Sequence, residues 1–213
     1  MKNLLFFLCV TITIVGYGQK IDYKNFDQNV ATKILAETFL KFRDTIDCFQ
    51  SRTKWLIVYP ESSLFPEMNK PKWSDWVYEN ISLFNTKEMI NHPYNEAYHV
   101  DREEWYLSNK DVVRKEYYRG IKNVPNERIE NAFLSYSENT FSSNSHEETY
   151  QDLANNIIKA WEESITHSSA MRGLFYDTFS YKRYKLKIQD LFACCVMYNP
   201  STRLTKGSIN FIQ

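Results

Sequence analysis

The chain has 213 residues, of which 43% are apolar and 16% aromatic, enough to bury one sizeable core. It carries 26 Lys and Arg residues against 26 Asp and Glu residues, so its formal net charge is zero. This balance excludes a nucleic-acid binder held by bulk phosphate attraction and a polyanionic disordered chain. Only five glycines are present, and they build no phosphate-binding loop of the common types, so nucleotide-dependent chemistry is not expected.

The first 18 residues have the pattern of a secretory signal peptide. Lys2 gives a short positive start, residues 4–15 are mostly apolar, and Gly16 and Gly18 supply small residues for cleavage. The apolar stretch is shorter than the roughly 20 residues of a transmembrane helix, and no later stretch is long and apolar enough to span a membrane. We expect cleavage after Gly18 and an exported protein, periplasmic or extracellular, with a single domain over residues 19–213. The alternative is an uncleaved N-terminal anchor or a buried helix.

Three stretches have the spacing of amphipathic helices. Residues 30–47 repeat apolar side chains at helical intervals, and residues 147–165 keep a strict i, i+4 series. Between them, Ser74 can cap a helix that runs to about residue 91 and ends before Pro93. The apolar side chains of the three helices are Leu35, Phe39, Phe42, Ile46, Trp76, Ile81, Phe84, Met89, Ile90, Leu153, Ile157, Trp161 and Ile165.

The C-terminal part of the chain has the features of a sheet. Residues 191–198 form a buried-strand pattern, a turn is predicted at Asn199 and Pro200, and residues 208–212 predict a short final strand. The polar stretch 139–148 predicts a surface loop, and the charged, tyrosine-rich stretch 98–136 is longer than a simple loop. Because helices come first and strands late, an α+β or three-layer α/β arrangement is expected.

Three cysteines follow the predicted signal peptide: Cys48, Cys194 and Cys195. Export permits a disulfide, and one interpretation pairs Cys48 with either of the two adjacent cysteines. Adjacent residues of a strand point to opposite faces, so only one of the two can easily meet Cys48. The other interpretation is that all three are small buried apolar residues.

Four histidines are candidates for chemistry: His92, His99, His146 and His167. Their spacing matches no metal-binding box such as HExxH. His92 follows a predicted helix end and His146 lies in the polar stretch, so both are expected at the surface. A lone histidine is more often structural than functional, so spacing alone assigns no site.

Residues 137–171 begin with a Ser-Glu-Asn segment and contain Trp161, Ser164 and His167 at the spacing W-x-x-S-x-x-H. With these two motifs the stretch resembles the C-terminal half of bacterial CAP domains, a superfamily that includes cysteine-rich secretory proteins, venom antigens and plant pathogenesis-related proteins. Residues 137–139 (SEN) are similar to the GEN segment of the family, with Ser in place of Gly. Trp161, Ser164 and His167 match its W-x-x-S-x-x-H helix end. The resemblance implies an α-β-α sandwich of the CAP type.

The same resemblance implies a cleft. Residues 85–99 are similar to the segment that leads to the first cleft histidine, here His99. His99, Glu138 and His167 would then converge at the surface, with Ser164 capping the helix end or supporting the wall. Many eukaryotic members have a second cleft glutamate where this chain has Ser164, so a complete tetrad is not expected.

The cleft that the resemblance implies has suitable ligands for a divalent ion such as Zn²⁺, with His99 and His167 as metal ligands and Glu138 beside them. Without a metal, Glu138 would hold one imidazole in position and raise its pKa. No nucleophile is evident, because no acid is assigned to orient His167 as a base.

Three functions follow from these features. The first is a secreted module that binds a lipid, a glycan or a partner protein in the cleft, and it is the one we favour. The second is a metal-dependent hydrolase of peptides or esters. The third is a structural or interaction protein in which the cleft is merely a polar network, because a fold alone does not specify a function.

Overall fold

The computed structural model describes residues 18–45, 71–92, 102–119, 136–172 and 191–212. They form helices and one mixed four-stranded sheet with the strand order β1-β3-β4-β2, so the α+β class is confirmed. The elements are α2 (Gln28–Thr45), β1 (Lys72–Trp73), α3 (Asp75–Val77), a π-helical turn (Tyr78–Ser82), α4 (Leu83–Asn91), α5 (Arg102–Tyr117), β2 (Tyr136–Ser143), α7 (Tyr150–Glu163), α8 (Ile165–Arg172), β3 (Leu191–Asn199) and β4 (Leu204–Ile212).

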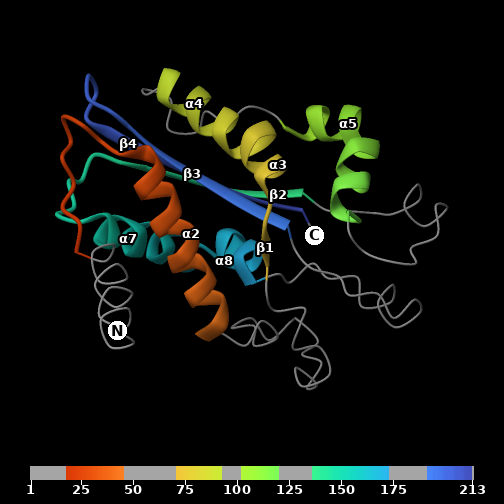
Figure 1. Ribbon diagram of the computed structural model, residues 1–213, viewed down its shortest axis with the longest axis horizontal. Helices are drawn as coiled ribbons and strands as arrows, with labels where there is room; N and C mark the ends of the chain where they lie inside the picture. The colour runs from red at the N-terminus through yellow and green to blue at the C-terminus, as the bar shows by residue number, and fades with distance from the viewer. Residues whose placement is uncertain (1–17, 46–70, 93–101, 120–135, 173–190, 213) are drawn as a thin grey trace, which may run out of the picture.

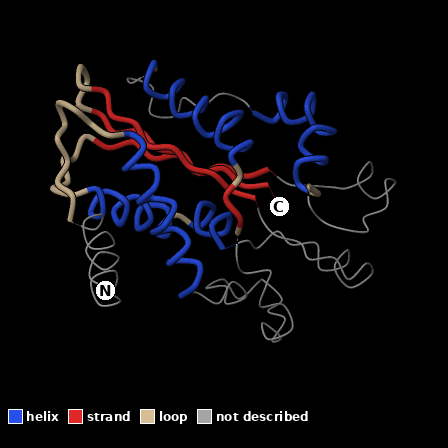
Figure 2. Tube along the Cα trace, viewed as in Figure 1, coloured by secondary structure: helices blue, strands red, loops and turns tan. Residues whose placement is uncertain are grey.

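The sheet is the central layer, with helices on both of its faces. Helices α2, α7 and α8 lie on one face, and α3 and α4 lie on the other (Figure 1). Figure 2 shows the strands between these two groups of helices. Strand β4 pairs antiparallel with β3 on one side and with all eight residues of β2 on the other, whereas β1 pairs parallel with the start of β3.

Helix α2 also covers part of the β3 edge, which β1 is too short to protect. Thr32 Oγ1 accepts a hydrogen bond of 3.1 Å from the backbone N–H of Val196. A side chain of the helix thus satisfies a strand donor that would otherwise lack a neighbouring strand.

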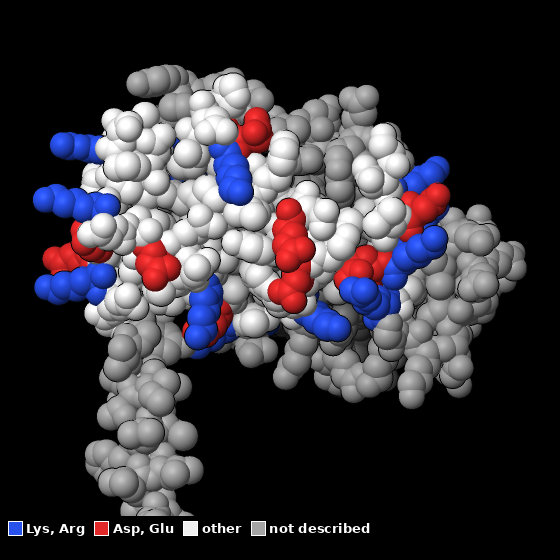
Figure 3. All heavy atoms as spheres, turned by 45° about the horizontal axis from the view of Figure 1, so that its top comes forward, with Lys and Arg blue, Asp and Glu red and all other residues white. Residues whose placement is uncertain are grey.

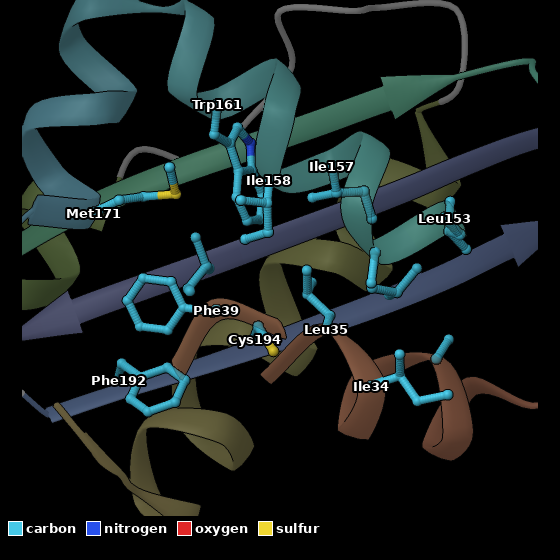
Figure 4. Close-up of a cluster of buried hydrophobic side chains, with 14 of the residues drawn as sticks. Ile34, Leu35, Phe39, Leu153, Ile157, Ile158, Trp161, Met171, Phe192 and Cys194 are labelled. Atoms are coloured by element: carbon cyan, nitrogen blue, oxygen red, sulfur yellow. The ribbon is translucent and has the colours of Figure 1, made fainter. Parts of the chain in front are cut away.

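The face under α2, α7 and α8 holds the larger apolar cluster (Figure 4). Three members of the series predicted for residues 147–165 are confirmed in α7, because Leu153, Ile157 and Trp161 are at most 1% exposed. The fourth, Ile165, begins α8. The Phe39 ring lies 4.9 Å from the ring of Phe192, centroid to centroid. Thr149 caps α7 by accepting from the N–H of Asp152, a favourable start for a helix.

The helix expected from Ser74 to residue 91 is present but interrupted. Ser74 Oγ caps it by accepting from the N–H of Val77, and a π-helical turn follows before α4 begins. Ile81 and Met89 are buried as predicted, but Phe84 is 43% exposed, because it points away from the sheet. The helix expected at 147–165 ends at Glu163, and a separate helix, α8, follows.

Three elements were not predicted, and the shortest is the two-residue strand β1. Strand β2 occupies residues that were assigned in part to a surface loop, and α5 lies within the unassigned stretch 98–136. Strand β2 was missed because its sequence, YSENTFSS, is polar on both faces and lacks the alternation typical of a half-buried strand. The final strand begins at Leu204, earlier than the predicted residue 208.

Several predictions fall on residues that the structure does not describe. They concern the signal peptide up to residue 17, Cys48, and the first cleft histidine, His99. Within the described ranges, no helix has the length and apolar character needed to cross a bilayer.

Candidate functional site

The sheet face under α4 carries a set of polar side chains that we call the polar strip. Its members are alternate residues of β2 and β4, together with the residues of the π-helical turn and of the start of α4 that face these strands. Six of its members are at most 2% exposed: Ser82, Asn85, Thr86, Lys206, Ser208 and Asn210. The other three are Tyr136, Glu138 and Ser142 of β2. Buried polar groups are tolerated only when hydrogen-bonded, so this face is built differently from an ordinary core.

A continuous chain of hydrogen bonds runs along the strip and ends at a carboxylate. Ser82 Oγ donates to Asn210 Oδ1 over 2.7 Å. Asn210 Nδ2 donates to the Tyr136 hydroxyl over 2.8 Å. The Tyr136 hydroxyl in turn donates to Glu138 Oε2 over 3.0 Å. Every donor in this chain therefore points toward Glu138.

The second oxygen of Glu138 is also held. Asn85 Nδ2 donates to Oε1 over 2.9 Å. A carboxylate with a donor on each oxygen has a fixed position and orientation. Glu138 is half-buried, so this end of the strip is less covered than its six buried members.

Tyr136 remains a phenol, and thus a donor, throughout the physiological pH range. Burial is the first cause that raises its pKa far above the ordinary value, and the charge of Glu138 is the second. An ionised Tyr136 would place two negative charges side by side in a poorly solvated region.

The π-helical turn sets the positions of the strip residues on the helix side. The N–H of Leu83 donates to the carbonyl of Tyr78, five residues back, which inserts one extra residue relative to an α-helix. Ser82 is the last residue of this turn, and Asn85 comes three residues later. Both side chains form hydrogen bonds with strand residues, so both face the sheet. Such turns often occur at functional sites.

Lys206 lies at the other end of the strip. Its side chain is 1% exposed, and Nζ donates to Ser142 Oγ over 2.7 Å. A lysine this deeply buried is rare in proteins and requires polar partners. The register places Lys206 opposite Ser142 and Glu138 opposite Asn210, so the two charged groups are four residues apart along the strands.

Glu138 and Asn139 are neighbours on β2, and their side chains point to opposite faces of the sheet. Asn139 Nδ2 donates to the carbonyl of His167 over 3.0 Å, which places the backbone of α8 on the Asn139 side of β2. Glu138 faces α4. The convergence of Glu138 with His167 in one cleft stays a prediction.

The pKa of His167 is shifted in the direction opposite to the one expected for an imidazole beside a carboxylate. Burial is the cause that lowers it from its ordinary value. A carboxylate beside the ring would act in the other direction, as we expected for one imidazole of the cleft. The raised pKa expected from Glu138 is therefore not found at His167, and His99 lies outside the described residues.

Ser164 lies at the junction between α7 and α8, where its extended backbone ends the first helix. Its carbonyl accepts from the N–H of Ser168, and its hydroxyl is 3.3 Å from that of Thr166. Neither contact is a hydrogen bond from a backbone N–H to the Ser164 side chain, so the capping or cleft-wall role of Ser164 stays a prediction. Among the described residues, no group of three or more His, Cys, Asp and Glu side chains is placed to hold a metal ion. A zinc site that uses His99 and His167 stays a prediction.

The two adjacent cysteines are free thiols, buried on opposite faces of β3. Cys194 belongs to the apolar cluster, whereas Cys195 Sγ accepts from Gln28 Nε2 over 3.6 Å. Burial raises the pKa of Cys195 to about 11 and that of Cys194 well above its ordinary range. Both thiols therefore stay protonated and weakly nucleophilic.

Sequence reasoning found one member of the strip, Glu138, and missed the others. The signal was the alternation in β4, where Lys206, Ser208 and Asn210 are interleaved with Gly207, Ile209 and Phe211. This pattern predicts a strand with one polar face. Such a face is usually solvated, and only the tertiary arrangement shows that α4 covers it.

The outer surface offers no simple indication of a charged partner. Figure 3 shows acidic and basic side chains interspersed over the described part of the face toward α4. This agrees with the balanced charge of the chain.

Comparison of the chain with family models, with curated proteins and with solved structures found no match. The likeness to CAP domains thus rests on the residues of the chain alone.

Proposed function

We propose that the chain is an exported, CAP-like binding module that takes a glycan at the Glu138 end of the polar strip. The observation that carries the proposal is the geometry of Glu138, whose two carboxylate oxygens are held by Asn85 and Tyr136 while the side chain is only half-buried. A pre-positioned carboxylate is well suited to a ligand with several hydroxyl donors.

The composition of the strip favours a glycan over a lipid. A lipid chain requires an extended apolar lining, whereas the groups around Glu138 are an amide, a phenol and, farther in, hydroxyls. An apolar ligand would remove water from these polar groups and offer them no hydrogen bond, so the groups favour a polar ligand. Export would place the module where structural polysaccharides occur.

The stability of the fold does not by itself account for the strip. Apolar residues of similar volume would fill this face at least as well, because a buried polar pair seldom stabilises more than its apolar replacement. A half-buried carboxylate at the end of such a network is therefore a functional-site candidate.

The test is a sedimentation assay with the mature protein, residues 19–213. Chitin, cellulose and peptidoglycan are the glycan probes, and anionic phospholipid vesicles are the lipid probe. We expect binding to one of the polysaccharides and at least about tenfold weaker binding by the Glu138→Gln variant, because a charge-assisted hydrogen bond is lost. Glu148→Gln, an exposed carboxylate in the loop before α7, is the matched control and should bind normally.

Three results would overturn the proposal. Binding to no polysaccharide would leave the structural role of the network as the better account. Equal binding by Glu138→Gln would place the site elsewhere. Binding to the vesicles alone would replace the glycan with a lipid ligand.

A further inference from the structure

The chain just after the predicted cleavage point is fixed against the start of α7. The N–H of Tyr150 donates to the carbonyl of Gln19 over 3.2 Å, and the N–H of Ile21 donates to the carbonyl of Glu148 over 2.9 Å. Lys20 and Thr149 form an isolated antiparallel bridge between these two bonds. Residues 19–21 are thus held as an extended segment along residues 148–150.

This contact satisfies a backbone hydrogen-bond donor at the start of α7. Tyr150 is the first residue of α7, and its N–H is one of the donors that a helix cannot satisfy internally. The Gln19 carbonyl satisfies it. The Tyr150 side chain is 2% exposed, and its hydroxyl accepts from the N–H of Asp27 over 2.8 Å, so the N-terminal segment is held there at two points.

Cleavage after Gly18 would add a positive charge at this position. The new α-amino group would stand two covalent bonds from the carbonyl carbon of Gln19, whose oxygen receives the Tyr150 N–H. A positive charge is unfavourable at the N-terminal end of a helix. The adjacent Lys20 adds a second positive charge.

We propose that Gln19 of the exported protein is cyclised to pyroglutamate. This inference rests on the export that we propose above. The α-amino nitrogen attacks the side-chain carbonyl carbon Cδ, a new N–Cδ bond forms, and the Cδ–Nε2 bond breaks. Ammonia leaves with a proton from the amine, and no oxidant or reductant takes part. The product is a neutral lactam, so the terminal charge disappears.

The geometry is compatible with this reaction. Gln19 is exposed, so its side-chain amide is accessible. The reaction uses the α-nitrogen and the side chain only, so the main-chain carbonyl of Gln19 is unchanged. The hydrogen bond from Tyr150 and the start of α7 are therefore preserved while the unfavourable charge is removed.

The test is mass spectrometry of the N-terminal peptide of the full chain, expressed in an exporting cell and purified without acid or heat. In most molecules we expect a peptide that begins at residue 19 and is lighter than the encoded sequence by about 17 Da, the mass of one ammonia. The matched control is Gln19→Ser, which keeps the cleavage site but has no side-chain amide and should show no loss.

The possible results separate this inference from the proposed function. A peptide that begins with unmodified Gln19 in most molecules would overturn cyclisation and leave export intact. A peptide that begins at Met1 would overturn both cyclisation and export, because Gln19 would then be internal. A start at any other residue would overturn cyclisation alone. Glycan binding through Glu138 is measured separately and does not depend on this result.

Discussion

The two faces of the sheet are made by alternate residues of the same strands, yet they differ in character along most of β4, although a smaller apolar cluster lies on the α4 face near β1. In β4, Ile209 and Phe211 belong to the apolar cluster under α2 and α7, whereas Ser208 and Asn210 face α4 and join the hydrogen-bonded chain. The apolar face stabilises by burial, in proportion to the area removed from water. The polar face must satisfy every group merely to avoid a penalty. We propose that the first face maintains the fold and that the second maintains a binding site.

Cys194 lies on the apolar face and Cys195 on the opposite face, so the reactivity of the two thiols tests both faces in one experiment. We expect each thiol to react with iodoacetamide about a thousandfold or more slowly in the native protein than in urea, because access requires global unfolding. The measurement is a time course of alkylation, read by mass spectrometry of the peptide that contains both. Rapid native modification of either thiol, or a disulfide-linked peptide with Cys48, would contradict the buried free thiols found here.

Trp161→Ala tests the apolar face. The side chain is 1% exposed, and its Nε1 donates to the carbonyl of Thr140 over 2.8 Å. We expect a loss of about 3–5 kcal/mol in the free energy of unfolding, measured by urea titration, because a large cavity forms. Phe84→Ala is the control, since Phe84 is 43% exposed, and it should change the stability by about 0.5 kcal/mol or less. Equal losses would refute this account of the core.

Asn210→Leu tests the polar face. It removes the acceptor of Ser82 Oγ and the donor to Tyr136. We expect a loss of about 1–3 kcal/mol in the free energy of unfolding, because buried polar groups are left without partners.

A double variant sharpens the same test. Combining Asn210→Leu with Ser82→Ala should cost less than the sum of the two single changes, because the second substitution removes one of the orphaned groups. Strict additivity would show that the Ser82–Asn210 hydrogen bond contributes nothing to the fold.

The smallest expected effect is the pH dependence from His167. Its pKa in the folded protein is below the ordinary value of 6.5. As the pH falls below that value, the unfolded chain takes up a proton that the folded protein does not, so the free energy of unfolding decreases. The stabilising share is thus present above pH 6.5 and is lost on acidification. His167→Asn should flatten the stability curve between pH 7 and pH 5, whereas a variant curve as steep as that of the parent would contradict the assignment.

Periodicity predicted the apolar face well and the polar face poorly. The i, i+4 series of α7 placed Leu153, Ile157 and Trp161 correctly in the core, because helical spacing and burial are directly linked. Strand β2 was missed because polar residues occupy both of its faces, so no hydrophobic pattern marks it.

The candidate site was hard to predict for a related reason. Ser82, Thr86 and Ser208 carry no individual signature of chemistry, and they become a site only when α4 lies over β4. In addition, no recognised sequence pattern predicts the π-helical turn, which orients Ser82. The resemblance pointed to Glu138 and paired it with His167, whereas the hydrogen bonds of the structure join Glu138 to Asn85 and Tyr136.

The most direct test of the central claim is an NMR titration of the asparagine side-chain amides with a soluble oligosaccharide of whichever polysaccharide is bound. Asn85 and Asn210 belong to the polar strip, whereas Asn139 binds the carbonyl of His167 on the opposite face. The account predicts that the Asn85 signals shift most, followed by those of Asn210, while those of Asn139 stay in place. Shifts at Asn139 with unchanged Asn85 and Asn210 would contradict it and move the site to the His167 side of the sheet.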